Sequence, residues 1–296
     1  MSQSVTTHFV QQYTTNVQLL SQQIGSRLIN SVTIGSYTGK AGVPVEQFAA
    51  TVASKRTTRY PALTPVETSA DRRWVYPVDY DWNDLIDNID KLRMLIDPQS
   101  HYVSNATAAM NRAMDDEIIN AYFGTSKTGV DGATSTTFLS ANQVSASEGS
   151  SAATGMNVEK LKAGIQLLLA NEAWDPSSGE RLTCVITAKQ NRNLMDEVQL
   201  INADYNGERA VVNDGFVMNW GKIDFIHSER LSNNGSTQRR CPLYVKSAMH
   251  LGKWQDISTD VSRRKDLAGL PYQVYVYGTF GATRIEEKKI VEIPCA

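Results

Sequence analysis

The chain has 296 residues, of which 41 % are hydrophobic and 20 % charged, and its 29 basic and 31 acidic side chains leave a formal net charge of −2. This composition is ordinary for a globular protein with a substantial core. The lack of a basic excess argues against tight binding of nucleic acid through its phosphates. No run of about 18 apolar residues suits a membrane-spanning helix. The polar start does not resemble a signal peptide, so we expect synthesis and use in a cytoplasm.

The first third of the chain predicts a helix followed by a long hairpin. Apolar residues at steps of three and four predict an amphipathic helix over residues 9–32, resting either on its own core or on a neighbour. Glycines and prolines then exclude a long helix over residues 35–77, and extended pieces at 43–48 and 73–78 indicate a hairpin with its tip near 60–65. A lone hairpin is marginal in water, so this loop either docks on a partner surface or stays a mobile surface loop.

Basic side chains gather on this hairpin, near its predicted tip. They are Lys55, Arg56, Arg59, Arg72 and Arg73.

Two helices are predicted next, over residues 83–96 and 105–123. The second would be about 28 Å long at 1.5 Å per residue, and Gly124 supplies its end. The face opposite its apolar stripe carries Asp115 and Asp116, and Glu117 follows them. Residues 125–155 are rich in glycine, serine and threonine and are typical of a surface excursion.

The remainder mixes helices and strands. A helix is predicted over 158–169 and a buried strand over 182–186, after which Thr187 and Gln190 form a capping box for a helix that reaches about residue 201. Strands are predicted at 216–218, 223–226 and 272–280, with a charged edge at 286–289. Helices and strands are grouped rather than in regular βαβ order, so the predicted fold class is α+β.

Two stretches resemble known ligand-binding motifs but lack residues that those motifs require. Residues 35–41 imitate a phosphate-binding loop, but the spacing is one residue short and Ala41 replaces the hydroxyl that holds magnesium. Asp79, Asp81 and Asn83 have the spacing of calcium ligands, but the required glycine and glutamate are missing. Asp81 and Asp84 suit the N-terminus of the predicted helix over 83–96 better, where they favour its dipole.

No reactive constellation stands out elsewhere. The four histidines (His8, His101, His227, His250) are scattered, and Cys184, Cys241 and Cys295 lack zinc-ligand spacing, so we expect reduced thiols. Asp115, Asp116 and Glu117 occupy consecutive helical positions and therefore point in different directions. The sequence predicts no catalytic residue, metal site or cofactor. Among enzymes, the alternative is a hydrolase whose active-site residues come from distant positions in the sequence.

The long hairpin and four further stretches, in this order along the chain, resemble the major capsid proteins of tailed double-stranded DNA bacteriophages. The four stretches are WVYPVDYDWNDLID at 74–87, INAYFG at 119–124, RRCPLYVKSAMHLGKW at 239–254 and YQVYVYGTFGATRIEEKKIVEI at 272–293. The resemblance covers nearly the whole chain, is weakest between residues 132 and 155, and is an overall similarity rather than one diagnostic motif. Another virion component, from the tail or the decoration of the shell, is the nearer alternative, although the repeats of a tail fibre are absent.

This resemblance implies the Hong Kong 97-type capsid fold. It assigns residues 1–35 to an N-terminal arm, 36–80 to an extended loop and 81–156 to a peripheral domain whose spine helix is 105–123. Residues 157–235 become an axial domain, and 236–296 supply C-terminal strands that return to the peripheral domain.

The resemblance also implies a structural role rather than an enzymatic one. Pentamers and hexamers of the chain would form an icosahedral shell around packaged DNA and would contact that DNA non-specifically. The further partners would be a separate scaffolding protein and a portal, and no membrane would be involved. Assembly would take place in the host cytoplasm. Because the extended loop of this fold lies across a neighbouring subunit, we expect its basic residues to approach Asp115, Asp116 and Glu117 of that neighbour.

Overall fold

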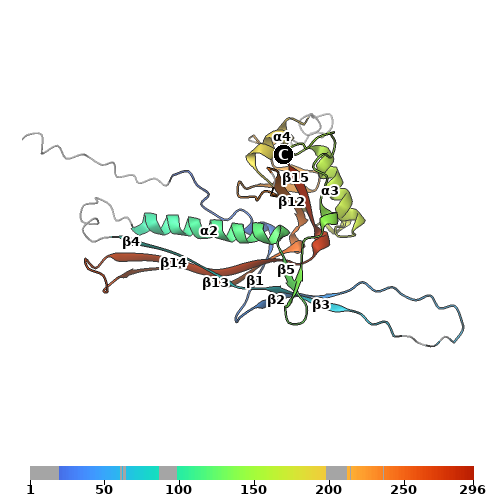
Figure 1. Cartoon of the computed structure of the whole chain (residues 1–296), viewed down its shortest axis with the longest axis horizontal. Coiled ribbons are helices and arrows are strands. Elements are labelled where there is room, and N and C mark those ends of the chain that lie inside the picture. Colours follow the sequence, from blue (N-terminus) through green and yellow to red (C-terminus); the bar gives the residue numbers. More distant parts are fainter. Residues whose placement is uncertain are drawn as a thin grey trace, which may run out of the picture. The chain divides into compact units, whose positions relative to one another are not determined.

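A computed structural model describes residues 20–60, 62, 65–86, 99–197, 212–213, 215–235 and 237–296 (Figure 1). The chain divides into two compact units. Unit 1 contains Met1–Gly25, Tyr80–Arg112 and Ile257–Gly278, and unit 2 contains Ser26–Asp79, Ala113–Asp256 and Thr279–Ala296. A long helix and three strands run through both. Among the described residues, no helix combines the length and apolarity needed to cross a membrane.

Unit 1 is built from the first part of helix α2 (Gln99–Phe123) and from parts of three strands: β4 (Val78–Ile86), β13 (Met249–Arg263) and β14 (Tyr272–Arg284). These strands belong to a sheet of order β1-β13-β14-β4. Val274 and Val276 of β14 are fully buried, whereas the alternate positions are only half-buried. The sheet therefore has one covered face and one open face, as its alternating sequence predicts.

The larger sheet of unit 2 holds most of its core. Its order is β10 (Asn219–Trp220), β11 (Ile223–His227), β7 (Leu182–Ile186), β12 (Arg239–Val245) and β15 (Ile290–Cys295). Every residue of β7 and β15 is buried. Helix α3 (Val158–Ala170) packs on this sheet at Gly164, where an added Cβ would lie 2.8 Å from a methyl of Leu243. Only glycine lets the helix approach so closely.

Three further parts of unit 2 complete the fold. A second sheet has the order β2 (Gly42–Phe48), β3 (Ala70–Val75), β5 (Ser126–Thr128) and β6 (Thr134–Thr136). Strand β1 (Thr33–Ser36) pairs in parallel with the start of β13. The third part combines the short helix α4 (Ala188–Met195) with the pair β8 (Val212–Asn213) and β9 (Phe216–Val217).

The α+β class is confirmed, and several predicted elements are found almost unchanged. Helix α2 ends at Phe123 as predicted but begins six residues earlier, so its 25 residues span about 37 Å. Helix α3 and strand β7 match their predicted positions. The capping box of Thr187 and Gln190 is present at the start of α4.

Three predictions of secondary structure were wrong. Residues 20–28 are not helical, and only a 3-10 turn at Ile29–Ser31 follows; the rest of the helix predicted over 9–32 lies outside the described residues. Residues 83–86 belong to strand β4, because alternation from Tyr80 through Trp82 suits a strand; residues 87–98 lie outside the described residues. The charged stretch before β15 is a 3-10 turn, Glu287–Lys289.

Helix α4 and strand β13 also differ from expectation. Helix α4 ends at Met195 rather than near 201, and the last predicted positions lie outside the described residues. Strand β13, which has 15 residues, was not predicted. Its second half, residues 257–263, is mostly exposed, so it lacks the buried alternation that marks a strand in a sequence.

Candidate assembly surface

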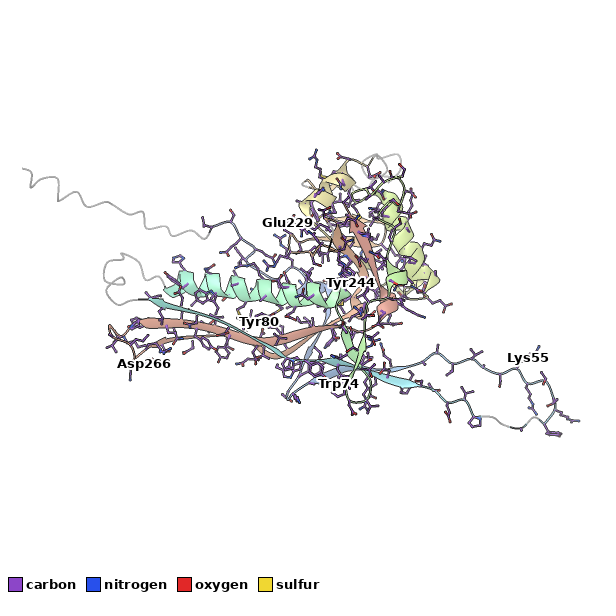
Figure 2. All side chains as sticks on the ribbon, in the orientation of Figure 1. Lys55, Trp74, Tyr80, Glu229, Tyr244 and Asp266 are labelled. Atoms are coloured by element: carbon purple, nitrogen blue, oxygen red, sulfur yellow. The ribbon has the colours of Figure 1, made fainter. Side chains whose placement is uncertain are left out.

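The extended loop leaves the second sheet between β2 and β3. Figure 2 labels Lys55 near the far end of this loop. Apolar side chains at the end of β2 and beyond it are exposed: Phe48 by 73 %, Val52 by 87 % and Tyr60 by 85 %. Large apolar side chains left in water over one segment are typical of a contact surface.

The tip of the loop is basic. Lys55, Arg56 and Arg59 are exposed, and no carboxylate among the described residues pairs with any of them. Arg56 donates to the carbonyl oxygens of Thr58, at 3.1 Å, and of Arg59. The guanidinium of Arg59 lies 5.8 Å from the centroid of the Tyr60 ring. The tip therefore presents two arginines held by local contacts and one lysine without any.

The base of the loop contains two arginines in opposite settings. Arg72 lies opposite Glu46 on β2 and pairs with it at 2.8 Å, with both side chains about half exposed. Arg73 is buried, and its two terminal nitrogens each donate to one oxygen of Glu287 at 2.6 Å. Arg73 was predicted to contact another subunit. The structure instead gives it a partner 214 positions further along the same chain, which no local pattern reveals.

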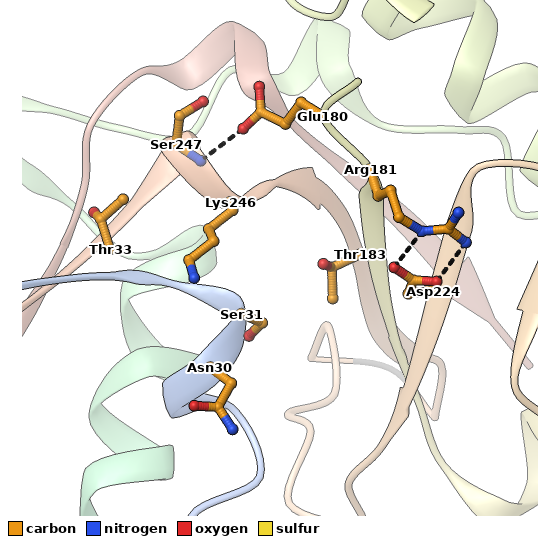
Figure 3. A pocket seen from close by; sticks show the side chains of 9 residues that line it. All are labelled: Asn30, Ser31, Thr33, Glu180, Arg181, Thr183, Asp224, Lys246 and Ser247. Carbon is orange, nitrogen blue, oxygen red and sulfur yellow. Dashed lines mark hydrogen bonds and ion pairs between the residues drawn. The ribbon is translucent and has the colours of Figure 1, made fainter. Parts of the chain in front are cut away.

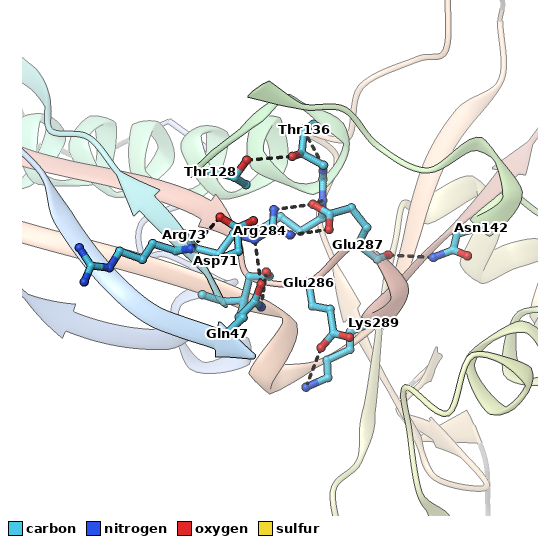
Figure 4. A network of polar contacts seen from close by, with 12 residues as sticks. Gln47, Asp71, Arg73, Thr128, Thr136, Asn142, Arg284, Glu286, Glu287 and Lys289 are labelled. Carbon is cyan, nitrogen blue, oxygen red and sulfur yellow. Dashed lines mark hydrogen bonds and ion pairs between the residues drawn. The ribbon is translucent and has the colours of Figure 1, made fainter. Parts of the chain in front are cut away.

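Glu287 joins this arginine to the end of helix α2 (Figure 4). Arg284, whose side chain is fully buried, donates to the carbonyls of Tyr122, in the last turn of the helix, at 2.9 Å and of Gly124, just after it, at 3.0 Å. Its Nε lies 3.6 Å from Glu287 Oε1. Burial lowers the pKa of the Arg284 guanidinium, and the charge of Glu287 acts against that shift. One carboxylate thus serves two buried cations, and we call these three residues, Arg73, Arg284 and Glu287, the loop anchor.

Gln47 and Asn142 add hydrogen bonds to the loop anchor. The Gln47 side chain accepts from Arg73 Nε at 3.2 Å and donates to the carbonyl of Ile285 at 2.9 Å. Asn142 donates to the main-chain oxygen of Glu287 at 2.8 Å. Strands β2 and β3, helix α2 and the chain before β15 therefore meet at one polar junction. Removing one member of a buried ion pair typically costs about 3–5 kcal/mol, because the other charge is left without a partner.

A histidine fastens the strand that leads into the loop. Thr33 Oγ1 donates to the Met249 carbonyl at 2.6 Å and accepts from His250 Nδ1 at 3.0 Å. His250 Nε2 is then free to accept from the Tyr37 hydroxyl at 2.8 Å. Burial lowers the pKa of His250 to about 4. The neutral ring therefore holds β1 against β13.

The three acidic residues predicted to meet the loop differ from one another. Asp115 is fully buried and accepts from Ser26 Oγ at 2.5 Å and from the Arg27 main-chain N–H at 3.0 Å. Asp116 forms a bidentate pair with Arg230. Glu117 is half-buried and lines a cavity of about 260 Å³ at the end of α2. Asp115 and Asp116, two of the three predicted partners of the loop, are thus engaged within the chain.

A larger polar cavity, of about 400 Å³, lies where β7 and β11 meet the start of β1 (Figure 3). Two of its charges neutralise one another, because Arg181 donates twice to Asp224, at 2.6 Å each, and Glu180 accepts from the Ser247 main-chain N–H at 3.2 Å. The contact with Asp224 raises the pKa of Arg181. No histidine or cysteine lines this cavity.

The two discounted motifs are structural. Residues 33–36 form strand β1, and Gly39 turns the chain with a φ of +91°, so no helix follows to hold a phosphate. Asp79, Asp81 and Asn83 lie on strand β4 rather than in a loop, which also removes the helix N-terminus proposed for Asp81 and Asp84. No cluster suited to a metal ion occurs among the described residues.

The three cysteines are free and fully buried in the large sheet. Burial raises the pKa of Cys184, and contact with Cys295 together with burial raises that of Cys241. Such thiols are poorly reactive, because the thiolate is the reactive form.

Comparisons with known proteins agree with this architecture. The family model described as phage capsid protein matches residues 5–296. A capsid structure of the cyanophage P-SCSP1u is similar, with a TM-score of 0.72 at 16 % identity over 99 % of this chain and 94 % of that one. The capsid of cyanophage Pam1 gives 0.73 at 11 % identity over 100 % and 98 %, and a structure from Mycobacterium phage Che8 gives 0.69 at 12 % over 97 % of each. No curated protein sequence matches significantly. The predicted capsid fold is confirmed.

Proposed function

This chain belongs to the phage capsid protein family, and from that premise we propose that its copies assemble as pentamers and hexamers into an icosahedral shell around phage DNA. As a capsid protein it is a structural component of the virion and not an enzyme. Family membership decides against both alternatives raised by the sequence, a tail or decoration component and a hydrolase.

The exposed basic and apolar loop carries this proposal. An isolated hairpin of this length does not bury its own apolar side chains, and Val52 and Tyr60 are indeed left in water. A neighbouring copy would cover them. Lys55, Arg56, Arg59 and Arg72 are then the inter-subunit residues of the loop. Arg73 serves instead to hold the loop in position.

The wider proposal concerns assembly in the cell. Subunits assemble in the host cytoplasm with a separate scaffolding protein and a portal. The formal net charge of −2 suits a wall that touches packaged DNA without sequence preference and without strong adhesion.

Electron microscopy of the chain, expressed with its neighbouring phage genes, tests the proposal. We expect closed shells containing five-fold and six-fold rings for the natural sequence. Small discrete oligomers alone, in preparations with and without those genes, would contradict shell formation.

A charge-reversed pair then tests the loop. Lys55→Glu with Arg59→Glu should abolish shells and leave folded subunits, because each copy then presents repulsion where it had attraction. Lys189→Glu with Lys246→Glu is the matched control, since both lysines are exposed and the charge change is the same. Normal shells from the loop pair, or equal loss from both pairs, would refute the role of the loop.

A further inference from the structure

A histidine at the end of strand β11 lies between two oppositely charged side chains. His227 Nδ1 lies 2.5 Å from Nη1 of Arg27, and its Nε2 lies 2.9 Å from Oε1 of Glu229. A guanidinium nitrogen can only donate a hydrogen bond, and an ionised carboxylate can only accept one. The imidazole is therefore neutral in this arrangement: Nδ1 accepts from Arg27, and Nε2 carries the proton that it donates to Glu229.

These three side chains join separate elements of unit 2. Arg27 precedes β1 and also donates from Nη1 to the main-chain carbonyl of His227 at 2.9 Å. Glu229 Oε1 accepts from the main-chain N–H of Ala188, the first residue of α4, at 2.6 Å. Burial acts to raise the pKa of Glu229, but the hydrogen bonds from Ala188 and His227 outweigh it, so that pKa is lowered. Glu229 therefore stays charged over the pH range in which a histidine takes up its proton.

The charges further from the imidazole are engaged with other groups. Arg230 is paired with Asp116 of α2. Arg239 of β12 acts on the carboxylate, because its charge helps to lower the pKa of Glu229. Strand β9 contributes the uncharged ring of Phe216, whose centroid lies 6.2 Å from that of the imidazole. Among the described residues, the charges in contact with the imidazole are therefore one cation and one anion.

We propose that His227 is a proton-operated latch, which holds Arg27 when the imidazole is neutral and releases it when the imidazole is protonated. Protonation places an N–H on Nδ1, so two donors and two positive charges then face each other across the 2.5 Å contact. The contact with Glu229 persists, because Nε2 keeps its proton. Histidine changes its charge between about pH 5 and 8, so the latch is closed above this range and open below it. The main-chain N–H of Arg27 remains bound to Asp115, and opening therefore loosens the segment before β1 without detaching it.

A nuclear magnetic resonance titration of the histidine rings in the full-length, unassembled subunit tests the competition between proton and guanidinium. The coupling is reciprocal: if the proton expels Arg27, then Arg27 must also oppose the proton. Arg27→Met should therefore raise the titration midpoint of His227 by about 0.5 pH unit, the size expected for a partly exposed contact. Arg72→Met removes an exposed arginine that pairs with Glu46, and as the matched control it should leave the midpoint unchanged. An unchanged midpoint in Arg27→Met, or an equal rise in the control, would overturn the proposal.

Hydrogen exchange measures whether the latch acts on the chain. After correction for the intrinsic effect of pH, residues 26–31 should exchange about twofold faster or more at pH 5.5 than at pH 7.5. His227→Gln can accept from Arg27 and donate to Glu229 without gaining a charge, so its corrected rates should be equal at both pH values. His250→Gln, which alters the other histidine near β1, should keep the acceleration of the natural sequence. No acceleration in the natural sequence, or acceleration that persists in His227→Gln, would refute the latch.

Discussion

The base and the tip of the extended loop use the same residue types for different purposes. At the base, Arg73 is buried and bound through two hydrogen bonds to Glu287, which also faces Arg284. At the tip, Lys55, Arg56 and Arg59 are exposed and have no acidic partner among the described residues. Buried charges without a partner are expensive, whereas exposed ones are not. The base therefore governs stability of the subunit, and the tip is free to govern contact between subunits.

The largest expected effect falls on the loop anchor. Glu287→Ala leaves two buried guanidinium groups without their shared carboxylate, so the free energy of unfolding should fall by about 3–5 kcal/mol. Urea denaturation of the unassembled subunit measures this. The tip pair Lys55→Glu with Arg59→Glu should change the same quantity by less than about 0.5 kcal/mol. Equal losses at both places would remove the distinction between base and tip.

Low pH should destabilise the strands at the base of the extended loop through His250. Its folded pKa of about 4 lies below the unfolded value of about 6.5, so the unfolded chain binds a proton first. Stability is then full above pH 6.5 and falls as the pH drops toward 4, by up to roughly 3 kcal/mol. Urea midpoints measured at pH 7.5, 5.5 and 4.5 would show this loss of stability.

The matched variant for this pH dependence is His250→Gln, which cannot gain a charge. Its unfolding free energy should be lower at neutral pH, because the contacts with Thr33 and Tyr37 are altered, and should fall less steeply in acid. The same slope in both proteins would assign the pH dependence to other groups.

A glycine beside the loop anchor should also be sensitive. A Cβ on Gly281 would lie 2.0 Å from the carbonyl oxygen of Tyr76, a main-chain atom between β3 and β4. Gly281→Ala must shift that backbone, and overpacking of this kind costs about 1–3 kcal/mol. Thermal unfolding measures it, with Gly25→Ala as control, because nothing lies within 4 Å of a Cβ there. An unchanged thermal unfolding temperature in Gly281→Ala would show that the backbone at this part of the loop base shifts at little cost.

The sequence predicted what depends on neighbours in the chain. Helix α3, strand β7 and the capping box of Thr187 follow from local periodicity and local hydrogen bonding. Glycines, prolines and two extended pieces indicated the hairpin, and the resemblance supplied the capsid fold. The two wrongly predicted helices, over 9–32 and 83–96, both had an apolar spacing compatible with a helix. Pairing with β14 instead places residues 83–86 in a strand.

The site was less accessible to prediction, because its contacts join distant residues. Five basic residues of the hairpin looked alike in sequence, yet Arg73 is paired with Glu287 in the interior. Asp115 looked like a surface charge, but it binds the main chain at Arg27.

The smallest effect should come from Arg72, the neighbour of Arg73. Its pair with Glu46 is about half exposed on both sides, and exposed pairs contribute about 0–1 kcal/mol. Arg72→Ala should therefore lower the free energy of unfolding by less than about 1 kcal/mol, whereas Arg73→Ala should cost several times more in the same urea experiment. Since the two residues are adjacent on one strand, strand propensity and loop length are matched between the variants. A loss at Arg72 as large as that at Arg73 would mean that the hairpin pairing itself, rather than the buried carboxylate, holds the loop, and stability would then extend from the base toward the tip.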